Sequence, residues 1–201
     1  MVLWLFARFS LCYTSVMKVI LGIVGEKLAG KDTAAKYLED KYGAFHIKFS
    51  QLLDEILEIL DMEKSRRNEI DLGLGLRDIF GPEVLYQALK KRVAEAPNDL
   101  SVINGIRMNE QEKIIKELGA KIIYVTAPVE TRFSRYMHRH EKVDDGKMNF
   151  EQFKKQEETE ATEVGIPKLG ERADFRIDNT GRVEDLFEKL DGIMKNLNIK
   201  M

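Results

Sequence analysis

Short apolar runs alternate along the chain with longer segments in which apolar residues recur every three or four positions. The clearest run is Val19–Val24, whose nearly continuous apolar sequence is typical of a strand buried on both faces. The predicted strands are 19–24, 44–49, 100–103, 121–125 and 173–179, and the predicted helices are 33–38, 51–57, 83–93, 110–118, 150–162, 183–197 and one that begins at 128. This alternation predicts an α/β protein, with a central parallel sheet between two layers of helices.

A chain of 201 residues, of which 44% are hydrophobic and 33% charged, fits one well-filled domain rather than two. We expect that domain over 17–201, with two segments that interrupt the strand–helix alternation. Residues 61–81 contain few aromatic residues and are expected to form a helical or loop insertion that grips an acceptor phosphate. Its candidate residues for that contact are Arg66, Arg67 and Arg77. Residues 132–162, which include the polar stretch 141–149, are expected to form a lid.

The first sixteen residues do not match the rest of the chain. Val2–Phe6 is apolar but too short to span a membrane, and no basic region precedes it, as a signal peptide requires. Met17 stands just before the first predicted strand. We therefore expect translation to start at Met17 and 1–16 to be an extension; the alternative is a hydrophobic segment that covers a sheet edge or a partner.

A glycine-bearing segment links the first predicted strand to the first predicted helix. It reads Gly25, Glu26, Lys27, Leu28, Ala29, Gly30, Lys31, Asp32 and Thr33, with two glycines and a lysine at phosphate-loop spacing. Glycines let backbone N–H groups face phosphate oxygens, and the helix N-terminus adds its positive dipole end. Lys31 supplies a mobile charge for the β- and γ-phosphates. We predict that these nine residues bind the phosphates of a nucleotide.

Asp32 occupies the position after the lysine, where a hydroxyl residue that ligates Mg²⁺ is usual, and the hydroxyl comes at Thr33. Two interpretations are open. Asp32 approaches Mg²⁺ or the acceptor, or it caps the helix while Thr33 does the metal work. Both residues are therefore candidate metal residues, and Asp32 is also a candidate catalytic residue.

Four arginines outside the insertion are further catalytic candidates. Arg107 follows the predicted strand 100–103 at its carboxyl end, where ligand-binding residues of open α/β sheets collect. Arg132, Arg135 and Arg139 are three and four positions apart, which predicts neighbouring places on one helix face. We expect these three to hold phosphate.

Charge and cysteine content narrow the class of partner. A net charge of −2 argues against a non-specific nucleic-acid binder, which needs a basic surface. The single cysteine, Cys12, excludes an internal disulfide and a cysteine-based zinc site and agrees with a reducing cytosol. We expect a cytoplasmic protein, monomeric or homodimeric, that acts on a small molecule and binds neither nucleic acid nor a membrane.

Three motifs resemble those of nucleoside-monophosphate-kinase-type proteins of the P-loop superfamily, which includes adenylate kinase and dephospho-coenzyme A kinase. The loop with its Gly-Lys-Asp-Thr ending resembles phage and bacterial deoxynucleoside monophosphate kinases, and so does 102–107 followed by Glu110. The segment 173–181 is similar to the end of dephospho-coenzyme A kinases. The resemblance covers nearly the whole chain from Met17. One departure is Asn104, which stands where these relatives commonly have Asp.

The resemblance implies a P-loop NTPase fold and an ATP- and Mg²⁺-dependent transfer of a phosphoryl group to a (deoxy)nucleoside monophosphate. It places Asn179 and Gly181 near the adenine. Arg107 and the insertion would hold the acceptor, and the lid arginines would surround the transferring group. Two alternatives are a dephospho-coenzyme A kinase and a regulatory protein that binds ATP without catalysis. The regulatory alternative stays open because the amide of Asn104 cannot act as a charged metal ligand or as a base.

Overall fold

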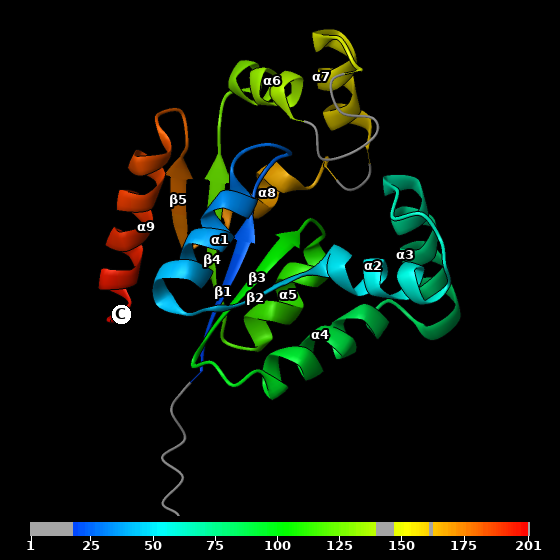
Figure 1. The fold of residues 1–201 in the computed structure, drawn as a ribbon, viewed down its shortest axis with the longest axis horizontal. Coiled ribbons are helices and arrows are strands. Elements are labelled where there is room, and N and C mark those ends of the chain that lie inside the picture. Colours follow the sequence, from blue (N-terminus) through cyan, green and yellow to red (C-terminus); the bar gives the residue numbers. More distant parts are fainter. Residues whose placement is uncertain (1–17, 140–146, 161–162, 201) are drawn as a thin grey trace, which may run out of the picture.

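Five parallel strands form a single sheet in the order β2-β3-β1-β4-β5 (Figure 1). The structure, a computed structural model, describes residues 18–139, 147–160 and 163–200. The strands are β1 Val19–Val24, β2 Phe45–Lys48, β3 Leu100–Ile106, β4 Lys121–Thr126 and β5 Phe175–Asp178. The parallel sheet predicted from the alternating pattern is therefore confirmed.

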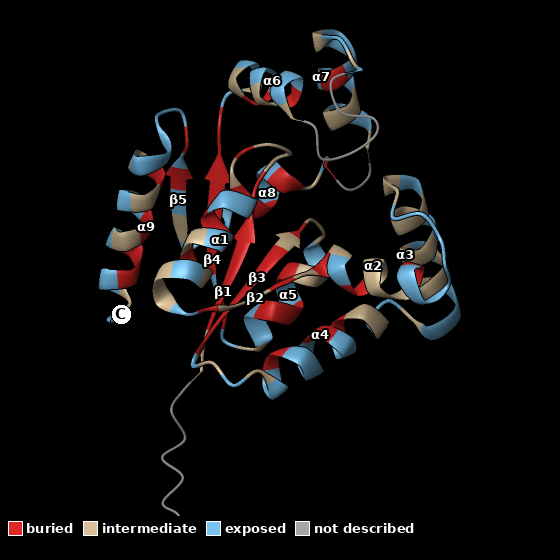
Figure 2. Cartoon of the chain, viewed as in Figure 1, coloured by how far each residue is buried: buried red, intermediate tan, exposed pale blue. Residues whose placement is uncertain are grey.

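Helices cover both faces of this sheet. They are α1 Lys31–Tyr42, α2 Phe49–Ile59, α3 Arg66–Phe80, α4 Val84–Glu95, α5 Asn109–Glu117, α6 Val129–His138, α7 Phe150–Thr159, α8 Ile166–Glu171 and α9 Val183–Asn196. Helices α1 and α9 pack on one face through a cluster that includes Leu38 and Leu190. Helices α2, α4, α5 and α8 pack on the other through a cluster that includes Leu89 and Ile115. Figure 2 shows the buried strands between the two helical layers.

Three elements differ from the sequence-based expectation. Strand β3 continues to Ile106, because Asn104 and Gly105, residues typical of turns, extend it instead of ending it; Asn104 is 1% exposed and pairs with Lys48 of β2. Helix α8 was not predicted, since its six residues are too few to show a helical period. Helix α7 also ends at Thr159, before the predicted end at 162.

The insertion predicted at 61–81 contains helix α3, which lies beside α2 away from the sheet (Figure 1). None of its fifteen residues is buried, and Ile79 and Phe80 are largely exposed. Gly73 lets the side chain of Leu53 approach the helix backbone. Helix α3 packs against α2 and α4, and its Arg66 also pairs with Glu160 and Glu163.

Helices α6 and α7 lie beyond the carboxyl ends of the strands, near the loop after β1 (Figure 1). An aromatic cluster joins them, in which Phe133 packs edge-on against Phe150 and Phe153, and Tyr136 and Phe153 are fully buried. The stretch 141–146 of the predicted lid lies outside the described residues, as do the segment 1–16 and the expected start at Met17. No helix in the described part of the chain is long and apolar enough to cross a bilayer.

Candidate active site

The loop between β1 and α1 has two glycines that no other residue could replace without a clash. A Cβ on Gly25 would lie 2.0 Å from the carbonyl oxygen of Val125, and a Cβ on Gly30 would lie 2.3 Å from Nδ2 of Asn179. Gly30 has a φ of 107° and is the N-cap of α1, so no side chain caps the first turn. The N–H groups of that turn lack intrahelical acceptors and suit an anion.

Lys31 begins α1 and is 7% exposed. Its Nζ atom donates a 2.6 Å hydrogen bond to the carbonyl oxygen of Glu26, which folds the side chain over the loop. Burial, together with the positive charge of Arg107, lowers the pKa of Lys31 to about 7. A bound phosphate would add negative charge beside this buried ammonium group.

Asp32 lies in the first turn of α1 and faces the ends of two strands. Its Oδ1 atom accepts a 2.8 Å hydrogen bond from Nδ2 of Asn104 and lies 2.7 Å from Nζ of Lys48. Burial acts to raise the pKa of Asp32, but the hydrogen bond and charge of Lys48 outweigh it and hold the pKa below its usual value. The helix-capping role considered for Asp32 is wrong, because the N-cap residue is Gly30 and Asp32 makes its contacts across the sheet.

Thr33 follows Asp32 on the same helix, and both residues are exposed. Successive residues of an α-helix point about 100° apart, so Thr33 and Asp32 face different directions. Asn104 adds an oxygen to the Asp32 side of the helix: its Oδ1 atom is buried and has no hydrogen-bond partner among the described residues. Carboxylate and amide oxygens are ligands that suit Mg²⁺ or its water shell, so Asp32 and Asn104 fit this metal, and the role of Thr33 remains a prediction.

Glu26 places a carboxylate inside the loop. Its Oε1 atom accepts a hydrogen bond from the hydroxyl of Tyr124 on β4, while no described group donates to its buried Oε2 atom. Burial and this hydrogen bond raise the pKa of Tyr124 to about 12. Lys27, the next residue, turns away to α6 and α7, where its ammonium group lies 5.2 Å from the ring centre of Tyr136.

Two lid arginines donate hydrogen bonds to backbone carbonyl oxygens of the loop. Arg135 donates to the carbonyl oxygens of Leu28 and Ala29, at 3.1 and 3.3 Å, and to that of Asn179 at 2.8 Å. Arg132, 6% exposed, donates to the carbonyl oxygens of Ala127 at 2.8 Å and Lys27 at 3.4 Å. It also forms an ion pair with Glu157 of α7.

Arg139 lies outside the helix that the spacing placed it on, because α6 ends at His138 and Arg139 is its extended C-cap residue. Its charge nevertheless helps to hold the pKa of Asp32 down, after the larger effects of burial and Lys48. The three lid arginines therefore do not share one helix face, and that expectation is wrong. Arg132 and Arg135 brace the loop, and only Arg139 extends a positive charge toward Asp32.

Asn179, at the end of β5, ties the last strand to the loop. Its backbone N–H donates to Thr126 at 2.7 Å, and its Nδ2 atom donates to the carbonyl oxygen of Ala29 at 2.8 Å. Gly181 lies in the turn that follows, against the carboxylate of Asp185. The predicted place of this turn near an adenine remains a prediction.

The arginines proposed for the acceptor separate into two groups. Arg66 and Arg107 meet at one buried carboxylate, that of Glu163. Arg67 lies at the surface, where it pairs with Asp71, and Arg77 contacts the sulfur of Met108 at 2.9 Å. Only the first pair therefore gathers positive charge beside the loop.

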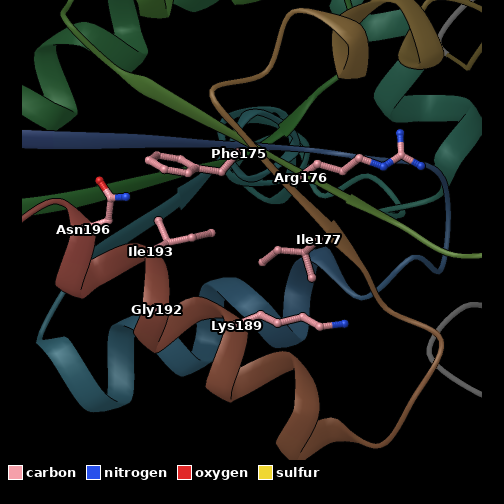
Figure 3. A pocket seen from close by; sticks show the side chains of 7 residues that line it. All are labelled: Phe175, Arg176, Ile177, Lys189, Gly192, Ile193 and Asn196. Carbon is pink, nitrogen blue, oxygen red and sulfur yellow. The ribbon is translucent and has the colours of Figure 1, made fainter.

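A hollow of about 320 Å³ lies between β5 and α9 (Figure 3). Its walls are Phe175, Arg176, Ile177, Lys189, Gly192, Ile193 and Asn196. No residue of the phosphate loop lines it, and the nearest strand residues are those at the edge of the sheet. We do not assign it to the site.

Three residues of the site were missed in the sequence. Lys48 stands at the end of a predicted strand, and this position at the carboxyl edge of the sheet could have identified it. Glu160 and Glu163 stand between α7 and α8, in a charged stretch where no pattern distinguishes them from solvated residues. Their partners are far away in the sequence.

The sequence matches no protein-family profile. It is 29% identical over 194 residues to a UPF0200/UPF0201 protein of Archaeoglobus fulgidus; the match covers 92% of this chain but only 58% of that longer relative. It is 28% identical over 187 residues to a UPF0200 protein of Saccharolobus islandicus, covering 90% of this chain and 96% of the relative.

Solved structures with the same architecture include TT1252 from Thermus thermophilus, with a TM-score of 0.63, 22% identity and coverage of 89% of this chain and 97% of that one. A shikimate kinase from Bacteroides thetaiotaomicron gives a TM-score of 0.59 at 13% identity, covering 90% and 98%. A gluconokinase from Sinorhizobium meliloti gives 0.52 at 12% identity, covering 90% and 97%. Together with the glycine loop and the sheet order, these similarities show that the chain has the fold of the P-loop kinases.

Proposed function

We propose that this protein is an ATP-dependent kinase that transfers the γ-phosphoryl group of ATP to a small phosphorylated acceptor, of the (deoxy)nucleoside monophosphate class. The observation that carries the proposal is the position of Lys31. It is a buried lysine at a helix N-terminus, with a pKa lowered to about 7 by burial and by Arg107. A buried cation beside the free N–H groups of a helix N-terminus is arranged for an anion.

The part of the proposed site that binds ATP, the phosphoryl donor, consists of the phosphate loop and the residues that brace it. Backbone N–H groups of the loop and of the first turn of α1 would bind the phosphates, and Lys31 would neutralise their charge. Arg135 and Asn179 would keep the loop in the required shape through the carbonyl oxygen of Ala29, to which both donate. Phosphoryl transfer depends mainly on such positioning and charge stabilisation.

The metal shell would lie at Asp32. Mg²⁺, when bound, neutralises phosphate charge and orients the transferring group. Asp32 would hold the ion or one of its waters, and Asn104 would orient this carboxylate through its amide nitrogen. Arg139 would add positive charge on the lid side of the same group.

The acceptor half would be the arginine pair Arg66 and Arg107. Arg107 lies close enough to Lys31 for its charge to lower the lysine's pKa, so a group bound at Arg107 would be next to the phosphate loop. Arg66 comes from α3, the helix that makes up the insertion. An acceptor bound between them would contact both the fixed sheet and the loosely packed insertion.

A substrate screen tests the function. ADP release with Mg²⁺ and ATP would be measured against the common ribo- and deoxyribonucleoside monophosphates and against dephospho-coenzyme A, with thermal shift recorded in parallel. We expect turnover with at least one nucleoside monophosphate. Turnover with dephospho-coenzyme A alone would change the acceptor class, and stabilisation by ATP without turnover on any acceptor would show a nucleotide-binding regulator instead.

A further inference from the structure

Lys48, the last residue of β2, holds its ammonium group against the carboxylate of the proposed metal shell. Its Nζ atom lies 2.7 Å from Oδ1 of Asp32, the same oxygen that accepts the hydrogen bond from Asn104. The side chains of Lys48 and Asp32 are 40% and 60% exposed. An ion pair this open to solvent contributes little to stability, so the ammonium group can leave Asp32 at a low cost.

A metal ion at Asp32 and the ammonium group of Lys48 would be close neighbours. The bond between Mg²⁺ and a carboxylate oxygen is about 2.1 Å long. Because Nζ of Lys48 lies 2.7 Å from Oδ1, a metal ion bound to that oxygen would be at most about 5 Å from Nζ. Two cations at this distance repel each other, so each weakens the binding of the other to Asp32.

Lys48 is the weaker of these two competitors when a nucleotide is bound. A divalent ion carries twice the charge of an ammonium group, and it also contacts the phosphate oxygens of the nucleotide. The ammonium group of a lysine stands on a flexible four-carbon stem, which lets it turn to another partner without a change in the backbone. We therefore expect Lys48 to leave Asp32 when the metal binds.

An anion bound at Arg107 would offer the displaced Lys48 a new partner. Lys48 pairs in register with Asn104 of the neighbouring strand β3, and Arg107 directly follows that strand. Burial, followed by the charge of Arg66, lowers the pKa of Arg107 to about 10, and the charge of Asp32 acts against this lowering. The charges of Asp32 and Arg107 therefore interact, which places the partner of Lys48 beside the proposed acceptor contact.

We propose that Lys48 exchanges partners as the site is filled: it pairs with Asp32 until Mg²⁺ binds there, and it then binds the anionic group of the acceptor. This exchange rests on the kinase function proposed above, because it takes Asp32 as the metal residue and Arg107 as an acceptor contact. It couples the two binding events, so that the acceptor binds more tightly once the metal is in place.

The metal half of the exchange is tested by titration calorimetry on the full chain. The non-hydrolysable β,γ-imido analogue of ATP is titrated at graded Mg²⁺ concentrations, which gives the Mg²⁺ affinity of the protein–nucleotide complex. We expect Lys48→Met to raise this affinity by about threefold or more, because the competing cation is gone. Lys121→Met is the matched control, since Lys121 also pairs with an aspartate, Asp174, but at the start of β4. This control should leave the Mg²⁺ affinity unchanged.

The acceptor half is tested with inorganic phosphate while the same analogue fills the phosphate loop. Phosphate binding is followed at the side-chain Nε–H resonance of Arg107, once with saturating Mg²⁺ and once without divalent metal. We expect Lys48→Met to weaken phosphate binding by about tenfold with Mg²⁺ and by less than about threefold without it. The reason is that Lys48 is available to the anion only when the metal holds Asp32.

A double-mutant cycle checks the exchange without any metal. Asp32→Asn removes the charge that holds Lys48, so Lys48 should bind phosphate in this variant even when Mg²⁺ is absent. In the Asp32→Asn background, Lys48→Met should therefore weaken metal-free phosphate binding by about tenfold, against less than about threefold in the native background.

Three results would overturn the proposal. They are a Mg²⁺ affinity that does not rise in Lys48→Met, an equal loss of phosphate affinity with and without Mg²⁺, and a phosphate titration that leaves the Arg107 resonance unchanged. An equal loss would make Lys48 a fixed charge that does not change partners. These outcomes are separate from the kinase function: turnover in the substrate screen together with any of them would leave a kinase without the exchange. The expected shifts in a protein that turns over no acceptor would keep the exchange and refute the kinase function.

Discussion

The amide nitrogen of Asn104 donates a 2.8 Å hydrogen bond to the carboxylate of Asp32, which joins the end of β3 to the first turn of α1. Asn104 is almost fully buried. Asp32 also forms an ion pair with Lys48, with 2.7 Å between Oδ1 and Nζ. Two carboxylates at this distance would compete for one proton, whereas an amide neighbour lets Asp32 stay charged. The single acid at this position is thus consistent with a metal-binding role for Asp32.

Asp32→Asn should reduce the Mg²⁺-dependent turnover of the proposed reaction by about tenfold or more, because a neutral amide is a poor partner for the ion. ADP affinity without Mg²⁺ should change by less than about threefold, since the loop is intact. A Mg²⁺ titration at saturating ATP measures the difference. Asp40→Asn is the control, as Asp40 lies on the same helix in a surface pair with Lys36. An Asp32→Asn curve that matches this control would remove Asp32 from the site.

Asn104→Asp should destabilise the protein by roughly 1–3 kcal/mol at neutral pH, because it buries a second carboxylate against Asp32. The new pair raises the folded-state pKa of one acid above its unfolded value. The folded state then binds more protons than the unfolded state, so the loss is largest above that pKa and shrinks as pH falls toward it. Denaturant unfolding at pH 5 and pH 8 measures this. Mg²⁺ with ADP should restore stability at pH 8, and equal losses at both pH values would contradict the prediction.

Nucleotide binding should be coupled to proton uptake by Lys31. The pKa of this buried group is lowered to about 7, so at pH 8 it is mostly neutral before binding, and phosphate favours its charged form. Titration calorimetry of ADP binding in two buffers of different ionisation enthalpy should show proton uptake by the native protein. The Lys31→Arg variant should show no such uptake, because arginine stays charged. Identical proton uptake in the two proteins would mean that Lys31 is not the group that titrates.

The side chain of Lys31 should also make the free energy of unfolding depend on pH. Between about pH 7 and its unfolded pKa of 10.5, Lys31 binds more protons in the unfolded chain than in the folded one. The unfolding free energy of the protein without nucleotide should therefore rise with pH across this window. Lys31→Met should flatten the rise, and an unchanged slope would count against the lowered pKa.

Lys31→Ala should lower turnover at least about a hundredfold, as removal of a preorganised charge at developing negative charge costs roughly 2.7–4 kcal/mol. Steady-state ADP release with the best acceptor from the screen measures this. Lys36→Ala, on the exposed side of the same helix, is the matched control. Near-normal turnover of the Lys31 variant would refute the phosphate-loop assignment.

Arg135→Met should weaken ADP and ATP binding to a similar extent, because Arg135 braces the loop through three carbonyl oxygens. Loss of these donors removes the Arg135 hydrogen bonds to Leu28 and Asn179, at about 1–3 kcal/mol, while the carbonyl oxygen of Ala29 keeps its bond from Asn179. Titration calorimetry with both nucleotides checks the expectation, with the exposed Arg182→Met as control. A loss confined to ATP would instead support a contact between Arg135 and the γ-phosphate.

The layers of the fold and the glycine-bearing loop after the first strand could both be predicted from the amino-acid sequence. Continuous apolar runs such as Val19–Val24 predict buried parallel strands, and the glycine and lysine spacing of 25–33 predicts a phosphate loop, because both depend on local chemistry. The sequence also identified Asn104 as a position to examine. It could not show that Asn104 would orient Asp32, since that contact joins residues 72 positions apart.

The partners of the arginines could not be predicted from the sequence and became visible in the folded chain. The spacing predicted that Arg132, Arg135 and Arg139 share one helix face, but the helix ends at His138. Arg132 and Arg135 donate hydrogen bonds to backbone carbonyl oxygens of the loop. The spacing of residues along a helix predicts which side chains share a face, but it does not predict which groups of the folded chain contact that face. The pairing of Arg107 with Glu163, 56 positions later in a charged stretch, likewise has no local signal. Long charged side chains are placed by the groups that the folded chain brings to them, and for Arg107 and Arg135 those groups are distant in the sequence.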